Sequence, residues 1–124
     1  MLMNKKLILF SILLLVCTAA LKAEPITRMV FFNLKHEAGS PEAEIFFKNA
    51  LVLKEVPSLS EFEILKVEGQ QFDFDYVIRL VFEDQQGVED YVNHEIHIDY
   101  LEKEWKANVT GGMLIDLLDI LPIE

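Results

Sequence analysis

The sequence of 124 residues contains a single cysteine, Cys17, within an apolar N-terminal segment. Because no second cysteine is present, an intramolecular disulfide framework is excluded and packing must hold the domain together. Basic residues are also few, with 11 Lys and Arg against 21 Asp and Glu, a net charge of −10. A chain this acidic repels phosphate backbones, and no basic stripe with interleaved aromatic residues appears. Nucleic acid is therefore excluded as a partner.

Long hydrophobic runs are absent as well. The apolar run Leu7–Val16 is shorter than the ~20 residues that a membrane-spanning helix requires. Two lysines precede it and small residues follow it, a pattern typical of a secretory signal peptide. We predict a signal peptide at residues 1–23, cleaved after Ala23 (or, as the alternative, after Ala20), and export to the periplasm or the medium. Lipid attachment at Cys17 is the weaker interpretation, because a bulky valine precedes that cysteine.

Residues 24–124 remain after this cleavage and have the size of a single domain. These 101 residues keep all 21 acidic residues but only eight of the 11 basic ones, so the mature net charge is −13. No repeat, linker or low-complexity segment divides them, and no membrane span is expected in them. A domain of this size without disulfides has a modest core, so pairing of two subunits is a natural source of further burial.

Hydrophobic periodicity predicts four strands separated by two helical regions. Ser40 and Asp84 can cap the two helices, and Pro57 ends the first one. The second helical region is interrupted and is predicted to resume after His97. The predicted strands are residues 28–35, 59–67, 74–82 and 113–121, with a loop at 108–112 before the last strand.

The order strand, helix, strand, strand, helix, strand is that of the ferredoxin-like β-α-β-β-α-β fold. This α+β fold places both helices on one face of a four-stranded antiparallel sheet. The first and third strands are apolar on both faces, with Phe31 on one face of the first; Arg79 interrupts one face of the third and would point toward whatever covers it. An open apolar face would promote aggregation, so we predict a homodimer in which two sheets pack face to face as a dimeric α/β barrel.

The segment Asp90–Trp105 carries the densest group of side chains that can transfer protons. His97 titrates near neutrality and can act as a general base, while Tyr91 can donate a hydrogen bond to a carbonyl oxygen. Together they suit an aldol-type ring closure or a proton-shuttling isomerisation. In the alternative, structural interpretation, Tyr91 is a core residue and His97 caps or supports the second helix.

Three further residues are candidates for binding a small molecule: His94, Arg79 and Phe31. Arg79 inside the barrel would favour an anionic end on an otherwise apolar ligand. His94 and His97, with acidic residues nearby, offer two nitrogens and one oxygen, but a closed metal site would need a further ligand. We therefore predict no metal, and no cofactor is expected because nothing marks a haem or flavin site.

Several segments resemble one family over essentially the whole mature chain. They are Arg28–Lys35, Leu53–Pro57, Tyr76–Phe82, the motif Asp90-Tyr91-x-x-His94-x-x-His97, and Leu117–Asp119. The chain is similar to the stress-responsive dimeric α/β-barrel (Dabb) family, and the Tyr-x-x-His-x-x-His motif is the most specific part of the match. The resemblance implies the ferredoxin-like fold and a barrel-forming dimer.

The resemblance also implies candidate roles, since a plant polyketide cyclase of this family uses the residues that match Tyr91 and His97. Two positions depart from the pattern. Glu95 stands where proline usually follows the first histidine, and Arg28 stands where the cyclase has a histidine. Two functions follow: an exported dimer that binds a small molecule or acts in stress response, and, as the alternative, a small lyase or cyclase.

Overall fold

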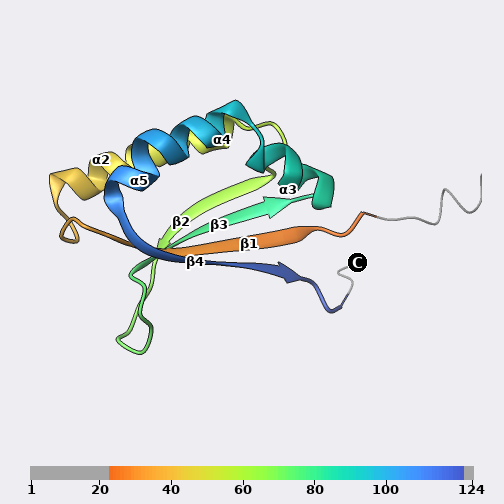
Figure 1. The fold of residues 1–124 in the computed structure, drawn as a ribbon. Coiled ribbons are helices and arrows are strands. Elements are labelled where there is room, and N and C mark those ends of the chain that lie inside the picture. Colours follow the sequence, from red (N-terminus) through yellow and green to blue (C-terminus); the bar gives the residue numbers. More distant parts are fainter. Residues whose placement is uncertain (1–22, 122–124) are drawn as a thin grey trace, which may run out of the picture.

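The computed structural model describes residues 23–121, so the predicted signal segment lies outside the described residues except for Ala23. Four strands and two helical regions follow one another along the chain (Figure 1). The elements are β1 (Ile26–Leu34), α2 (Pro41–Ala50), the 3-10 helix η1 (Leu51–Glu55), β2 (Glu61–Lys66), β3 (Tyr76–Phe82), α3 (Gln85–Val92), α4 (Glu95–Tyr100), the π-helical turn η2 (Leu101–Trp105), α5 (Lys106–Asn108) and β4 (Val109–Leu118).

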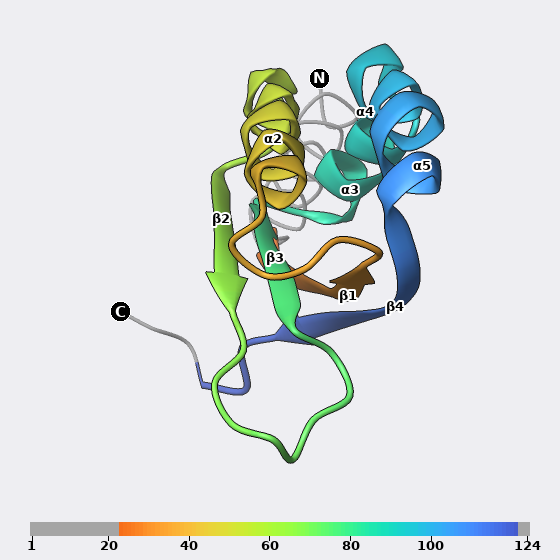
Figure 2. The ribbon, with the colours of Figure 1, turned by 90° about the vertical axis from the view of Figure 1, so that its left-hand side faces the viewer.

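The strands form one antiparallel sheet in the order β2-β3-β1-β4. All helices lie on one face of it, in two rows: α2 above the β2 side, and α4 with α5 above the β4 side (Figure 2). This arrangement confirms the ferredoxin-like β-α-β-β-α-β fold predicted from the sequence. No helix within residues 23–121 is long and apolar enough to cross a membrane.

The last strand differs from its prediction at both ends. β4 begins at Val109 and ends at Leu118, so the expected loop at 108–112 is wrong. Gly111 and Gly112 pair with Asn33 and Phe32 of β1, since main-chain hydrogen bonds need no side chain. A register shift follows at once in β1, between Asn33 and Leu34.

The caps of the first two helices are as predicted. The Ser40 and Asp84 side chains accept hydrogen bonds from the amides of Ala43 (3.2 Å) and Gly87 (2.8 Å). The prediction that the second helical region resumes after His97 is wrong. His94 is itself the cap of α4, so His97 lies inside this helix.

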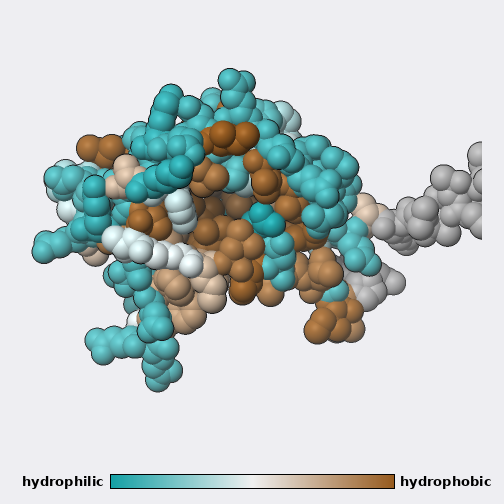
Figure 3. Space-filling view, viewed as in Figure 1, coloured by the Kyte–Doolittle hydropathy of each residue, from teal (hydrophilic) through white to brown (hydrophobic). Residues whose placement is uncertain are grey.

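The core lies between the helices and one face of the sheet. Phe32, Phe46 and Phe82 are fully buried there, and the indole of Trp105 packs on Phe32 with ring centroids 5.2 Å apart. In the view of Figure 3, apolar residues gather between the helical layer and the edge strand β4. Because side chains alternate between the two faces along a strand, Val30, Phe32 and Leu34 of β1 point toward the helices.

The other sheet face has no helix over it. Met113, Ile115 and Leu117 alternate along β4 on this face and are 38–47% exposed. The loop between β2 and β3 projects below the sheet (Figures 1 and 2), and its Phe72 packs against Phe31 with ring centroids 4.9 Å apart. Most of this apolar face remains open in a single chain.

Candidate functional site

A cavity of about 550 Å³ lies between the helices and the β1–β4 side of the sheet. Its volume falls within the range of roughly 300–1,000 Å³ that is usual for small-molecule sites. Apolar side chains of β1 and β3, including Val30, Ile78 and Leu80, line one wall. The helical wall contributes three polar side chains, Tyr91, His97 and Tyr100. The site is thus an apolar pocket with a few polar groups at one side.

Tyr91 and His97 are brought together although six positions separate them. Their ring centroids are 4.4 Å apart, and the planes are inclined by 41°. Tyr91 lies in the last turn of α3 with its ring edge-on to Phe82, while His97 lies in the first turn of α4. The break between α3 and α4 turns the chain so that both side chains face the same cavity. The pairing that the motif predicted is present in the folded chain.

The hydrogen bond of His97 determines its tautomer. Nδ1 lies 3.1 Å from the carbonyl oxygen of Val92, and a carbonyl oxygen can only accept. Nδ1 therefore carries the proton, and Nε2 keeps the free lone pair. Burial lowers the pKa of His97, although the hydrogen bond to Val92 acts in the opposite direction. The ring is thus neutral at neutral pH and can accept a proton at Nε2.

Two tyrosines that line the cavity keep their hydroxyls protonated. Burial raises the pKa of Tyr91 and of Tyr100 well above their ordinary value. Both residues are only 3% exposed. The Tyr100 hydroxyl is buried and has no hydrogen-bond partner within the part of the chain that the structure describes. Tyr100, which sequence reasoning missed, therefore presents an unused donor.

A charged side chain of the cavity wall belongs to an ion pair between two strands of the sheet. Nε and Nη2 of Arg28 donate to the two carboxylate oxygens of Asp116, over 2.8 and 2.9 Å. The pair joins β1 to β4 on the helix-facing side, and Arg28 lines the cavity. Its hydrogen bonds raise the pKa of Arg28 and lower the pKa of Asp116. The sequence had marked Arg28 only as a departure from the family pattern, and its alternation with Val30 and Phe32 was the signal available.

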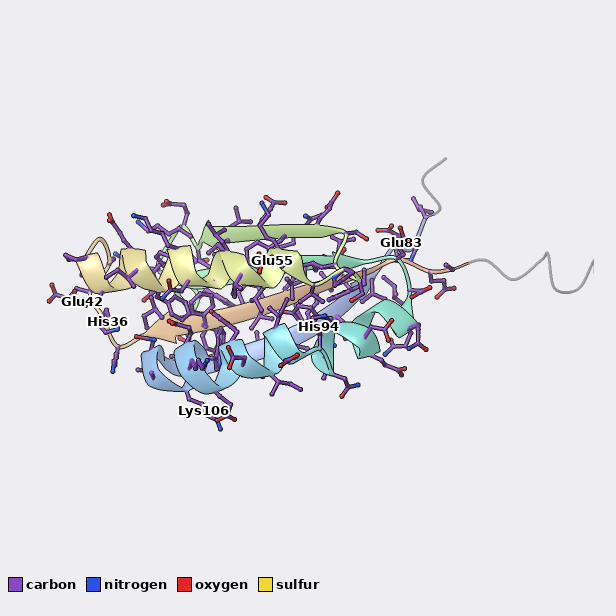
Figure 4. All side chains as sticks on the ribbon, turned by 90° about the horizontal axis from the view of Figure 1, so that it is seen from above. His36, Glu42, Glu55, Glu83, His94 and Lys106 are labelled. Carbon is purple, nitrogen blue, oxygen red and sulfur yellow. The ribbon has the colours of Figure 1, made fainter. Side chains whose placement is uncertain are left out.

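His94 has a structural position in this chain. Its Nδ1 accepts a hydrogen bond of 3.1 Å from the amide of Ile96, which caps α4. Figure 4 labels His94 at the junction of α3 and α4. His94 is not among the residues that line the cavity. Within residues 23–121, no group of three or more His, Cys, Asp or Glu side chains could hold a metal ion.

Phe31 and Arg79 lie on the opposite face of the sheet, away from Tyr91 and His97. Arg79 pairs with Glu63 (2.7 Å) and Glu61 (3.0 Å) from the neighbouring strand β2. The five predicted site residues thus divide among three places: the cavity, the cap of α4 and the open sheet face.

These features define a small ferredoxin-like α+β protein with an apolar cavity under its helical layer. The model of the "Stress responsive A/B Barrel Domain" (Dabb) matches residues 26–119. The chain belongs to this family, as the resemblance predicted. Among curated proteins, none matches the chain.

Solved structures with the same fold include proteins with and without an assigned activity. A Dabb family protein from Mesorhizobium loti has 25% identity and a TM-score of 0.74, covering 82% of this chain and 99% of its own. A dimeric protein of unknown function from Bacteroides fragilis has 12% identity and a TM-score of 0.60, covering 77% and 96%. The hydroxynitrile lyase from Passiflora edulis has 10% identity and a TM-score of 0.68, covering 82% and 98%.

Proposed function

We propose that this protein is an exported homodimer in which each subunit binds one small, largely apolar molecule under its helical layer. The observation that carries the proposal is the cavity of about 550 Å³ with Tyr91, His97 and Tyr100 on one wall. A buried hydroxyl without a partner is costly, and Tyr100, which carries such a hydroxyl, lines the cavity, which supports a ligand there. Export rests on the N-terminal signal pattern.

The homodimer rests on the open sheet face. Met113, Ile115 and Leu117 leave a contiguous apolar strip on the edge strand, and a second copy of the same face would cover it. Dimeric proteins of the same fold support this assembly. In such a dimer Phe31 and Arg79 lie at the subunit interface, whereas the cavity stays within each subunit.

Native mass spectrometry of the protein purified from its own cells tests the proposal. We expect a dimer that carries a reproducible extra mass, lost on denaturation, and an N-terminus at Glu24. A dimer without extra mass would contradict ligand binding, and a stable monomer would contradict the packing of the open face. An intact Met1 in the mature protein would contradict export.

Proton-transfer catalysis is the second candidate, supported by the contact between Tyr91 and His97 and by the lyase activity of a protein with this fold. His97 Nε2 would remove a proton from a carbon beside a carbonyl group, and Tyr91 would donate a hydrogen bond to the oxygen that gains negative charge. Tyr91→Phe and His97→Gln test this assignment. Turnover lost with unchanged thermal stability supports catalysis, while stability lost with unchanged ligand response supports a structural role.

A further inference from the structure

The polar and charged side chains of the cavity wall limit the chemical class of ligand that can bind there. Arg28 is the only charged side chain on the cavity wall within residues 23–121. Its side chain is 13% exposed, whereas that of its partner Asp116 is 40% exposed and does not line the cavity. The carboxylate is therefore the better solvated member of the pair, and the cation is the one that faces the cavity.

Arg28 retains donors after pairing with Asp116. The carboxylate engages Nε and Nη2, so both N–H groups of Nη1 and the second N–H of Nη2 remain. No other group within residues 23–121 accepts a hydrogen bond from this guanidinium. The bidentate pair also fixes the plane of the guanidinium, so a ligand meets an ordered donor.

Tyr100 provides a second, independent indication of an acceptor. Tyr100 lines the cavity, and its hydroxyl is buried with no partner within the described chain. Tyr91 and Arg28 line the same cavity, and the Arg28 cation acts to lower the pKa of Tyr91 against the effect of burial. The polar side of the cavity is therefore rich in donors, and His97 Nε2 is the acceptor that it offers.

We propose that the ligand is a small, largely apolar carboxylic acid, bound as its carboxylate by Arg28 and the hydroxyl of Tyr100. A planar carboxylate matches the free edge of a guanidinium, and an apolar body matches the remaining wall. The mature net charge of −13 opposes anion binding at long range. Salt screens that repulsion beyond about 10 Å at 0.1 M, so the contact with Arg28 determines the affinity. This inference rests on the proposed ligand-binding function.

Three probes with the same apolar body but different charge test the inference: phenylacetate, phenylacetamide and phenethylamine. Binding to the ligand-free dimer is measured by NMR titration, which gives both the affinity and the residues whose signals shift. We expect phenylacetate to bind at least about tenfold more tightly than the amide, and the amine to bind most weakly, because charge-assisted hydrogen bonds are roughly twice as strong as neutral ones.

Amino-acid substitutions test where the carboxylate of phenylacetate binds. The double variant Arg28→Gln with Asp116→Asn removes the cation without leaving its partner unpaired, and it should abolish the preference for phenylacetate. Tyr100→Phe keeps the ion pair and should weaken phenylacetate about three- to tenfold, the loss of one hydrogen bond. Arg79→Gln is the matched control on the opposite sheet face and should retain the preference.

The outcomes separate the ligand class from the site itself. Equal affinity for all three probes, with shifts at the cavity, would overturn the carboxylate while the proposed site stands. A preference abolished by Arg79→Gln but retained without Arg28 would place the anion on the open sheet face and overturn the inference. Absence of binding by every probe up to millimolar concentration would overturn both proposals.

Discussion

Tyr100→Phe is expected to stabilise the ligand-free protein while weakening its ligand binding. The ring of Tyr100 is 3% exposed and packs near Phe46, with centroids 6.3 Å apart, and the substitution keeps this ring. Only the hydroxyl is lost, and it has no partner in the described chain. Since a buried polar group without a partner costs about 1–3 kcal/mol, removing it should raise the free energy of unfolding by about 1 kcal/mol.

A thermal melt measures this gain. For a domain of this size, 1 kcal/mol corresponds to a rise in Tm of about 4–8 °C. The protein must be freed of ligand first and its mass checked, because a bound ligand stabilises the folded state and would obscure the comparison. Tyr76→Phe is the matched control: burial raises the pKa of Tyr76 as well, but its hydroxyl is less deeply buried. Tyr76 is a core residue that is 7% exposed, but its variant removes only this better solvated hydroxyl and should leave Tm within about 2 °C of wild type.

Tyr100→Phe should also lose part of the stabilisation that phenylacetate gives to the wild-type protein. A variant that has a higher Tm without ligand, but gains less Tm when phenylacetate is added, has lost a hydrogen-bond donor that acts only on the ligand. A Tyr100→Phe protein that melts below wild type in the ligand-free state would refute the reasoning, because the hydroxyl would then have a partner that stabilises the fold.

Three other predictions address assembly, pH and packing. Ile115→Lys, at a side chain 38% exposed on the open face, should convert the dimer to a monomer in light scattering, whereas Ile45→Lys on the outside of α2 should not. Burial lowers the pKa of His97, so the folded state binds a proton at this ring less readily than the unfolded chain. The free energy of unfolding should therefore fall as the pH drops below about 6.5, and it should fall less steeply in His97→Gln. Phe32→Ala, which empties a fully buried site, should cost about 3–5 kcal/mol in denaturant melts.

The fold could be predicted from the sequence because its main determinants are local. Alternation in β1 and β3, together with the caps at Ser40 and Asp84, indicates the elements and their order, and the order indicates the topology. The start of β4 could not be predicted, since Gly111 and Gly112 have low strand propensity and join the sheet only because β1 offers main-chain partners. Tertiary pairing overrides propensity there.

The candidate site was predictable only in part. Tyr91 and His97 are linked by a local motif, and the short break between α3 and α4 brings them together. Arg28 and Asp116 are 88 positions apart, and their contact depends on the register of β1 with β4. Tyr100 could not be predicted, because the second helical region was expected to resume only after His97, whereas the helix that buries Tyr100 begins at Glu95 with His94 as its cap.

The two faces of the sheet differ in what covers them, and this difference leads to a prediction about ligand binding. Arg28 lies on the helix-facing side and Arg79 on the open side, so each side of the sheet carries one arginine with acidic partners. Of the apolar strip only Met113 lines the cavity, and Ile115 does not, so the covering of Ile115 and the lining of the cavity are separate. A monomeric Ile115→Lys protein that remains folded should therefore still bind phenylacetate. Loss of binding on monomerisation would show that the partner subunit completes the site.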